Sequence, residues 1–386
     1  MNTSWWRNQK QMDQAQRDFI DLPIEGRYFV SGPPGSGKTN LLLLRAEVTV
    51  GSGERDILFI TFTRSLADFI RSGAVARGLI ENHQIKTFHS WAFEHVLHHL
   101  GERIVSKEID FDESVRAQAL AQIQEANTRR PSKNLYSAIF IDEAQDLSVG
   151  ELRALLELSE NVCICGDGRQ GIYEQDGIQI SELEGLENYH LDKHFRIGQA
   201  IAKVADRLMP PAEGAPTLEE TCNYDPSIQG KSTAELHPCD TREAQFGMML
   251  EKIRLQLDAF NGDSIGIFCP RQEDRVELRA KFDKTDLAGS VFVHGVDDQA
   301  TFSSTKPIHV LTLHGCKGTE FRCVHIFGAE GLRYFPLNRT KLSYTGVTRA
   351  KTALNVYRSG PTTVKLENSF SQKRLFGLGN LLPEED

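Results

Sequence analysis

The stretch Tyr136-Ser-Ala-Ile-Phe-Ile-Asp-Glu-Ala-Gln-Asp146 decides the fold, because it joins a strand to chemically active side chains. Its short apolar run predicts a buried strand, and the strand delivers two adjacent carboxylates, Asp142 and Glu143, to its C-terminal end. An ATPase uses such a pair: one carboxylate holds Mg²⁺ and the other orients and deprotonates the attacking water. The Gln145-Asp146 extension is typical of nucleic-acid motors. Without a phosphate-binding loop, the stretch would be only an acidic strand end.

A phosphate-binding loop lies upstream. Arg27-Tyr-Phe-Val-Ser31 predicts a strand, and Gly32-Pro-Pro-Gly-Ser-Gly-Lys-Thr39 then satisfies the pattern G-x-x-x-x-G-K-[ST] before a helix-like run. Backbone N–H groups of such a loop surround phosphates, and the new helix points its positive end at them. We expect Lys38 to contact the β- and γ-phosphates of ATP and Thr39 to bind Mg²⁺. A Gly/Pro-rich turn without a ligand is the alternative, and the downstream carboxylates argue against it. The loop residues expected to bind the nucleotide are Gly32, Pro33, Gly35, Ser36, Gly37, Lys38 and Thr39.

The composition indicates a soluble globular protein with room for two domains. The chain has 386 residues, of which 40% are hydrophobic and 25% charged. No run of 18 apolar residues is present, and residues 1–10 lack the apolar segment of a secretory signal, so we expect a cytoplasmic protein without membrane contact. The net charge of −9 neither favours nor excludes nucleic acid, since a motor can grip a strand in a local cleft.

Cysteine and histidine residues do not predict a metal site. The seven cysteines show no metal-binding spacing, and we expect Cys163 and Cys165 to pack in the core of a protein from a reducing compartment. His95, His98 and His99 lie close together on an expected helix, but no ligand motif accompanies them. A packed or solvated helix face is the preferred interpretation.

The chain divides into two halves with α/β patterns. In the first half the expected strands cover residues 27–31, 56–61, 136–141 and 161–166, with a helical insertion at about 92–134. In the second half they cover residues 234–237, 264–269, 308–313, 323–327 and 353–357, with helices at 241–258 and 272–283. Alternating strands and helices predict parallel sheets with sites at the strand C-termini. We expect a first domain at 1–195, a second at 196–359 and a tail at 360–386.

Several further segments carry a family resemblance. They are Met12-Asp-Gln-Ala-Gln-Arg17, Ile60-Thr-Phe-Thr-Arg64, Lys86-Thr-Phe-His-Ser90, Cys165-Gly-Asp-Gly-Arg-Gln-Gly-Ile-Tyr173, Leu191-Asp-Lys-His-Phe-Arg196, Val310-Leu-Thr-Leu-His-Gly-Cys-Lys-Gly-Thr-Glu-Phe321 and Ser343-Tyr-Thr-Gly-Val-Thr-Arg-Ala-Lys351. With the phosphate loop and the carboxylates, they make the chain resemble superfamily 1 helicases of the UvrD/Rep type over roughly residues 12–358. The resemblance implies two RecA-like P-loop NTPase domains in tandem, with ATP in the cleft between them.

The resemblance also implies nucleotide contacts from both halves. Gln16 would read adenine, Phe195 would stack on it, and Glu320 would touch the ribose. Gln170 would sense the γ-phosphate, while Arg196 and Arg349 would stabilise the charge that spreads over the γ-phosphoryl oxygens, an effect worth about 10³–10⁵ in rate. A lone arginine near a strand is usually a surface ion pair, but the ordered set of motifs argues against that interpretation here. Catalysis would then require the two halves to close.

Candidate nucleic-acid contacts follow from the same resemblance. They are Thr61, Phe62, Thr63, Thr87, His89, Tyr173, Thr312 and His314. Hydroxyls and helix starts hold phosphates, and an aromatic ring stacks a base for about 1–3 kcal/mol. Packing of Phe62 and Phe88 in the core is the alternative interpretation. The family usually continues after Tyr173 with Trp-Arg-Gly-Ala, whereas this chain has Glu174-Gln-Asp-Gly177, which weakens the expected strand contact.

The large accessory subdomains of the family are missing. Only residues 92–134 and 273–307 occupy the two insertion points, so the chain looks like a reduced motor core. The resemblance implies Mg²⁺-dependent ATP hydrolysis coupled to 3′→5′ movement along single-stranded DNA. One alternative is a nucleotide switch that gates a partner effector, such as a nuclease in a defence or repair complex. Another is a motor that acts on RNA, since base stacking does not separate the two polymers.

Overall fold

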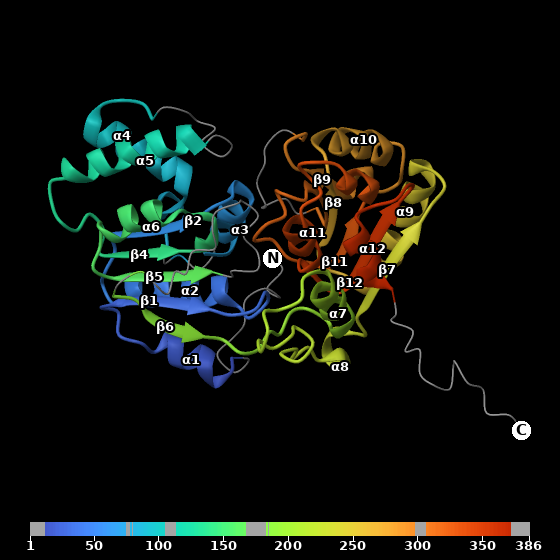
Figure 1. Cartoon of the computed structure of the whole chain (residues 1–386), viewed down its shortest axis with the longest axis horizontal. Helices are drawn as coiled ribbons and strands as arrows, with labels where there is room; N and C mark the ends of the chain where they lie inside the picture. Colours follow the sequence, from blue (N-terminus) through green and yellow to red (C-terminus); the bar gives the residue numbers. More distant parts are fainter. Residues whose placement is uncertain are drawn as a thin grey trace, which may run out of the picture.

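The computed structural model describes residues 12–74, 78, 80–104, 113–166, 183, 185–297 and 306–371. These residues form two six-stranded sheets whose strands all pair in parallel (Figure 1). Parallel sheets need helices on both faces, and both sheets have them. The expected α/β class with two parallel sheets in tandem is confirmed. No helix in the described residues is long and apolar enough to cross a membrane.

The first sheet has the strand order β3-β2-β4-β5-β1-β6. Its strands are β1 (Arg27–Ser31), β2 (Ile57–Thr61), β3 (Ile85–Thr87), β4 (Ala138–Ile141), β5 (Val162–Gly166) and β6 (Glu187–His190). Strands β2, β4 and β5 are buried along their whole length because they are short apolar runs in the middle of the sheet. In Figure 1 the arrows of this sheet point toward the second half, so the chemistry at their C-terminal ends faces that half.

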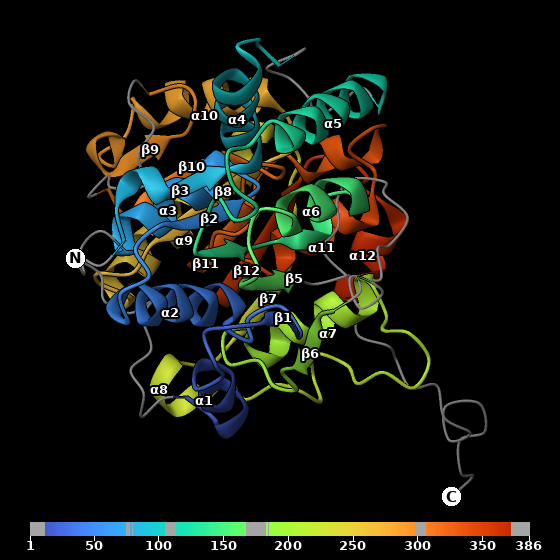
Figure 2. The ribbon, with the colours of Figure 1, turned by 90° about the vertical axis from the view of Figure 1, so that its left-hand side faces the viewer.

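Helices cover both faces of the first sheet. They are α1 (Gln14–Ile20), α2 (Lys38–Gly51), α3 (Arg64–Ala74), α4 (Phe88–Leu100), α5 (Glu113–Thr128) and α6 (Val149–Leu156), with short 3₁₀ turns η4 (Asn82–Gln84) and η5 (Ala144–Asp146). Side chains of α1, α2 and α3 form one core cluster with the sheet, and those of α4, α5 and α6 form another. Figure 2 shows α2 and α3 on one side of the strands and α5 and α6 on the other.

The second sheet has the strand order β7-β12-β11-β8-β10-β9. Its strands are β7 (Thr233–Pro238), β8 (Ile265–Cys269), β9 (Val291–Val293), β10 (Ile308–Thr312), β11 (Phe321–Ile326) and β12 (Ala350–Arg358). Its helices are α7 (Gln199–Leu208), α8 (Pro226–Gln229), α9 (Arg242–Ala259), α10 (Gln272–Phe282), α11 (Thr340–Val347) and α12 (Val364–Phe370), with 3₁₀ turns η7 (Ala288–Ser290) and η8 (Ala329–Arg333). One face packs on α7, α11 and α12, and the other packs on α9 and α10.

Every strand expected from the sequence is present within a few residues of its expected bounds, and Cys163 and Cys165 are buried. Three strands escaped prediction. Strands β3 and β9 have three residues each, and β6 (Glu187-Asn-Tyr-His190) is a polar edge strand that is mostly exposed. Part of the expected C-terminal tail is also ordered, since α12 packs against α7 and buries Leu366. Residues 372–386 lie outside the described part of the chain.

Candidate nucleotide and nucleic-acid site

The phosphate loop connects the end of β1 to the start of α2. Gly35 and Gly37 adopt left-handed φ angles of 84° and 92°, which only glycine takes without strain. Gly37 is the N-cap of α2, so the free N–H groups of the first helical turn face the loop. A Cβ at Gly35 would lie 3.0 Å from Cβ of Arg196, which comes from the chain after the first sheet. The loop therefore has space for phosphates only because glycine, which has no Cβ, stands at these positions.

Two expected nucleotide contacts are bonded to the loop itself. The Lys38 ammonium donates hydrogen bonds to the carbonyls of Gly32 at 2.7 Å and Pro33 at 3.0 Å. The Gln16 side chain is buried, and its amide donates a 2.7 Å bond to the carbonyl of Ser36. Gln16 is held there by the capping box that Asp13 starts at the N-terminus of α1. Both side chains thus lie beside the loop on which ATP phosphates are expected.

The two carboxylates sit at the end of β4 in contrasting environments. Oδ1 of Asp142 accepts bonds from the Cys165 thiol at 2.7 Å and from the backbone N–H of Glu143 at 3.0 Å. Thr39 adds a side-chain hydrogen bond to the same carboxylate. Oδ2 is buried and has no hydrogen-bond partner among the described residues. Burial, and then the charge of Glu143, raise the pKa of Asp142 to about 6.

An orphaned, buried carboxylate oxygen beside a hydroxyl fits a cation. Mg²⁺ prefers oxygen ligands and usually takes only one or two from the protein, leaving the rest to phosphates and water. Asp142 and Thr39 meet that description. Within the residues that the structure describes, no group of three or more His, Cys, Asp or Glu side chains forms a dedicated metal cage.

Glu143 differs from Asp142 in its backbone conformation and in the direction of its pKa shift. Its backbone is left-handed, with φ 54°, a strained conformation for a residue with a side chain. Burial acts to raise the pKa of Glu143, but the charges of Lys317, Arg349 and Lys38 outweigh burial and hold that pKa below its usual value. The side-chain amide of Gln145 donates a hydrogen bond to the same carboxylate. Glu143 is therefore ionised at neutral pH, and two of its three cationic neighbours come from the second half.

Arg196 and Arg349 meet at the boundary between the halves. Arg196 donates to Oε2 of Glu320 at 2.8 Å and to the carbonyl of Thr348 at 3.1 Å, while its stem lies against Gly35. Arg349 is 2% exposed, and burial together with the charge of Arg196 lowers its pKa. Two like charges held this close, near the phosphate loop, form a site for a polyanion.

Glu320 and Phe195 are also placed at this boundary. Glu320 forms ion pairs with Arg196 and Lys351, the latter at 2.6 Å. Burial would raise the pKa of Glu320, but these two cations lower it to about 2. Phe195 is 8% exposed, and its backbone N–H donates to the carbonyl of Gly35 at 3.2 Å. Gln170 lies outside the described residues.

The residues expected to contact a strand are less uniform. Thr61 is fully buried, Phe62 is 8% exposed within the core of the first half, and Thr87 caps α4 by accepting the backbone N–H of Ser90. In this conformation these three side chains offer little surface to a nucleic acid, so Phe62 packs as the core alternative expects. His89 meets Phe62 edge-on at 5.6 Å between ring centroids.

The strand candidates of the second half lie at the end of β10. The hydroxyl of Thr312 accepts the backbone N–H of Gly315 at 3.1 Å, and His314 is half-buried. Burial, and then the charge of Arg339, lower the pKa of His314. Tyr173 lies outside the described residues.

A connection between the halves was not expected from the sequence. Lys317 is 1% exposed, and its ammonium lies 2.5 Å from Oδ1 of Asp146 in the first half. The hydroxyl of Thr63 donates to the carbonyl of Lys317 at 3.4 Å, and a Cβ at Gly318 would overlap Leu66 of α3. Lys317 and Asp146 each belong to a motif that is recognisable in the sequence, but the motifs do not predict that these two residues pair.

Comparison with known proteins bears on these arrangements. Residues 307–357 match the family of UvrD-like helicase C-terminal domains, and residues 20–176 match a family of AAA domains. None of the curated proteins matches the chain. Among solved structures, "The structure of PRRSV helicase" matches with 14% identity and a TM-score of 0.38, over 89% of this chain and 54% of that chain. The present chain thus spans about half the length of that helicase.

The two family matches cover separate parts of the sequence, one in each half. One contains the phosphate loop with Asp142 and Glu143, and the other contains Lys317, Glu320 and Arg349. Together with this geometry, the two matches support a UvrD-like helicase of superfamily 1.

Proposed function

We propose that this protein hydrolyses ATP with Mg²⁺ and uses the reaction to move along single-stranded DNA. The observation that carries the proposal is the position of Arg196 against Gly35 of the phosphate loop. An arginine from one half beside the phosphates held by the other makes hydrolysis depend on closure of the halves. The two moving units in this proposal are residues 1–195 and a second unit from residue 196 that also includes α12.

Each residue of the nucleotide site has a proposed task. Asp142 and Thr39 hold Mg²⁺, which supplies charge neutralisation at the phosphates, and the orphaned Oδ2 of Asp142 supports this assignment. Glu143 takes the proton of the attacking water, which its lowered pKa and ionised state permit. Lys38 and Gln170 bind the γ-phosphate, and Arg196 and Arg349 stabilise charge as it develops. Gln16 and Phe195 bind adenine, and Glu320 binds the ribose.

Lys38 and Glu320 would exchange partners when ATP binds. Lys38 now donates to loop carbonyls, and these bonds would give way to phosphate oxygens. Glu320 now binds Arg196, and a γ-phosphate would compete for the same guanidinium. The nucleotide on the loop of the first half thus acts on an ion pair of the second half, and this exchange is the proposed start of the stroke.

The path of the nucleic-acid strand is proposed to run across both halves, close to the nucleotide site. Thr63 bonds to the carbonyl of Lys317, whose ammonium reaches Asp146 three residues beyond Glu143. A strand held by Thr63, Thr312 and His314 would therefore be linked by a few bonds to the base that drives hydrolysis. The choice of DNA over RNA and the 3′→5′ direction rest on the family resemblance alone.

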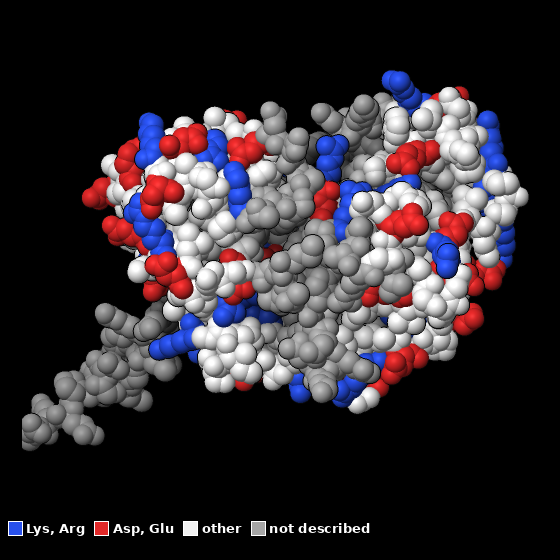
Figure 3. Space-filling model, turned by 180° about the vertical axis from the view of Figure 1, so that it is seen from behind, with Lys and Arg blue, Asp and Glu red and all other residues white. Residues whose placement is uncertain are grey.

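A nucleotide switch that gates a protein partner is the second candidate. Lys and Arg side chains are interspersed with Asp and Glu among the described residues on the face in Figure 3. A motor that grips a strand non-specifically usually presents a basic groove, so a surface of mixed charge favours the switch to this extent.

Displacement of streptavidin from end-labelled oligonucleotides separates the candidates. We expect the full chain with ATP and Mg²⁺ to displace streptavidin from the 5′ end of single-stranded DNA faster than from the 3′ end, as a 3′→5′ motor must. Oligonucleotides of RNA test the polymer in parallel. ATP hydrolysis without end-specific displacement on either polymer would contradict the motor and support the switch.

A further inference from the structure

Two adjacent aromatic rings are exposed on the second half. Tyr334 is 58% and Phe335 is 79% exposed, in the loop between η8 and α11. No other aromatic ring in the described part of the chain ranks among the exposed large hydrophobic side chains. Exposing two neighbouring rings forfeits roughly 1.5–3 kcal/mol of burial for each, so a pair of this kind marks a binding surface.

The loop lies at the C-terminal end of the strands of the second sheet, where the candidate nucleic-acid contacts Thr312 and His314 also lie. Turn η8 follows β11, and a Cβ at Gly331 would lie 3.2 Å from Pro270, which follows β8. Strand β8 pairs with both β11 and β10, and β10 ends at Thr312. The C-terminal ends of three adjacent strands therefore carry, in order, the aromatic loop, the Pro270-Arg271 segment and Thr312 with His314.

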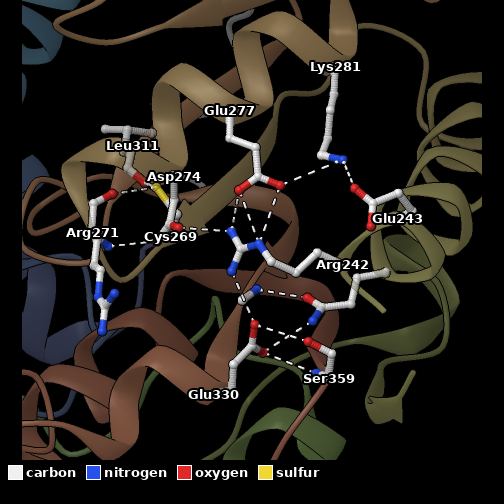
Figure 4. A network of polar contacts seen from close by, with 12 residues as sticks. Arg242, Glu243, Cys269, Arg271, Asp274, Glu277, Lys281, Leu311, Glu330 and Ser359 are labelled. Carbon is white, nitrogen blue, oxygen red and sulfur yellow. Dashed lines mark hydrogen bonds and ion pairs between the residues drawn. The ribbon is translucent and has the colours of Figure 1, made fainter. Parts of the chain in front are cut away.

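Basic side chains accompany the rings. The Arg271 guanidinium lies 5.9 Å from the centre of the Tyr334 ring, in reach of a cation–π contact. No ion pair of Arg271 occurs among the described residues, and in Figure 4 its guanidinium points away from the neighbouring acidic groups. Arg333 directly precedes the rings. Positive charge beside exposed rings complements a polymer of phosphates and bases.

An ion-pair network around Arg242 anchors the loop that carries Tyr334 and Phe335 (Figure 4). Arg242 of α9 bonds to Asp274 at 2.8 Å, Glu277 at 2.7 Å and Glu330 of η8 at 3.1 Å. Glu330 also accepts the backbone N–H of Ser359 at 3.1 Å, and Asp274 accepts that of Arg271 at 3.0 Å. The network thus anchors both η8 and the backbone of Arg271. It also engages the nearby carboxylates, which reduces their repulsion of a phosphate.

We infer that Tyr334, Phe335 and Arg271 form a subsite for single-stranded nucleic acid, where the rings stack on bases and the guanidinium holds a phosphate. The subsite continues the path of Thr312 and His314 across the end of β8. It rests on the proposed function, because it assigns a further contact to the same strand. Charge complementarity and continuity with that path select nucleic acid over a protein as the occupant.

Binding of a single-stranded oligonucleotide that carries 2-aminopurine tests the subsite. Stacking on an aromatic ring quenches this base, and loss of one stacked base costs about 5- to 150-fold in affinity. We expect Tyr334→Ala/Phe335→Ala to lose at least 5-fold in affinity together with the quenching, and Tyr334→Trp in place of Tyr334→Ala to restore both. The far-UV circular dichroism spectrum of the double variant should match the wild type, since both rings are exposed.

Matched variants separate the subsite from general effects. Leu255→Ala removes an apolar side chain of α9 that is 70% exposed, and it should leave strand affinity unchanged. Arg271→Ala should flatten the dependence of log affinity on log salt concentration by about 0.7, the value for one phosphate on a single strand.

The outcomes distinguish the two proposals. Wild-type binding that the double variant retains in full, with undiminished quenching, overturns the subsite while the proposed function stands, and it assigns the rings to a protein contact. Absence of strand binding by the wild type itself, with DNA and with RNA, overturns both.

Discussion

Lys317 and Asp146 form a buried ion pair that joins the two halves of the molecule, with 2.5 Å between Nζ and Oδ1. The pair is expensive to bury and specific in geometry, because each charge leaves water only for the other. Burial raises the pKa of Asp146 to about 6 although Lys317 opposes the shift, and Lys317 is also the strongest cationic influence on Glu143. Lys317 of the second half thus pairs with Asp146 and also lowers the pKa of Glu143, two acidic residues of the first half.

Removal of this lysine should destabilise the closed arrangement. We expect Lys317→Met to cost about 3–5 kcal/mol in free energy of unfolding at pH 8, because Asp146 stays buried without its partner. The cost should shrink toward pH 5, where Asp146 takes up a proton. Urea unfolding at both pH values measures it. Lys317→Met/Asp146→Leu should recover most of the loss; a double variant as unstable as the single one would contradict the pairing.

The two boundary arginines should matter for the rate of hydrolysis rather than for ATP binding. We expect Arg349→Lys and Arg196→Lys each to lower kcat by about 10³-fold or more, since lysine does not reproduce the planar fork that binds phosphoryl oxygens. Steady-state ATPase assays together with binding of a fluorescent ATP analogue measure the two quantities separately. Arg254→Lys is the matched control, because Arg254 pairs with Asp286 at the surface. Loss of ATP affinity with an unchanged kcat would contradict the assignment.

Acid should destabilise the fold partly through buried histidine. His325 is fully buried, donates to Gln256 at 2.7 Å and meets the Tyr357 hydroxyl at 3.0 Å. Burial, and then the charge of Lys252, lower its pKa to about 3 from 6.5. The neutral imidazole therefore favours the folded state above pH 6.5, and this stability is lost as the pH falls below 6.5 because the unfolded chain gains the proton first.

The histidine effect is measurable against a matched variant. We expect His325 to account for about 2 kcal/mol of the stability lost between pH 7.5 and pH 5, at about 1.4 kcal/mol per pH unit below 6.5. Urea unfolding across this range should show a shallower decline for His325→Gln than for the wild type. His83→Gln, at an exposed position, should follow the wild-type curve. Parallel curves for all three proteins would exclude this role.

Much of the architecture was predictable because the central strands of both sheets are short apolar runs bounded by motifs. The positions of the phosphate loop and of Asp142-Glu143 were also predictable, because each directly follows such a strand. Strand β6 was not predictable, because its polar residues Glu187-Asn-Tyr-His190 pair only at an edge. Helix α12 was missed because seven residues show too little periodicity, and packing on α7, β7 and α11 stabilises it.

Pairing across the halves was beyond the sequence for a different reason. Lys317 and Asp146 are 171 residues apart, so their contact depends on how the two sheets pack. Arg196 and Glu320 both belong to the second half, but 124 residues separate them. Tertiary packing also decides which rings are exposed. The motif around Phe62 predicts a stacking surface, but Phe62 is buried, whereas no such motif marks Tyr334 and Phe335, which are exposed.

The most direct test of the central claim is the ATPase rate of Glu143→Gln with and without single-stranded DNA. Glutamine keeps the size and hydrogen bonding of the side chain but cannot accept the proton of water, so we expect kcat to fall by at least about 10²-fold while ATP still binds. Glu160→Gln, which changes an exposed carboxylate paired with Lys133, should keep the wild-type rate. Hydrolysis by Glu143→Gln at the wild-type rate would contradict the account.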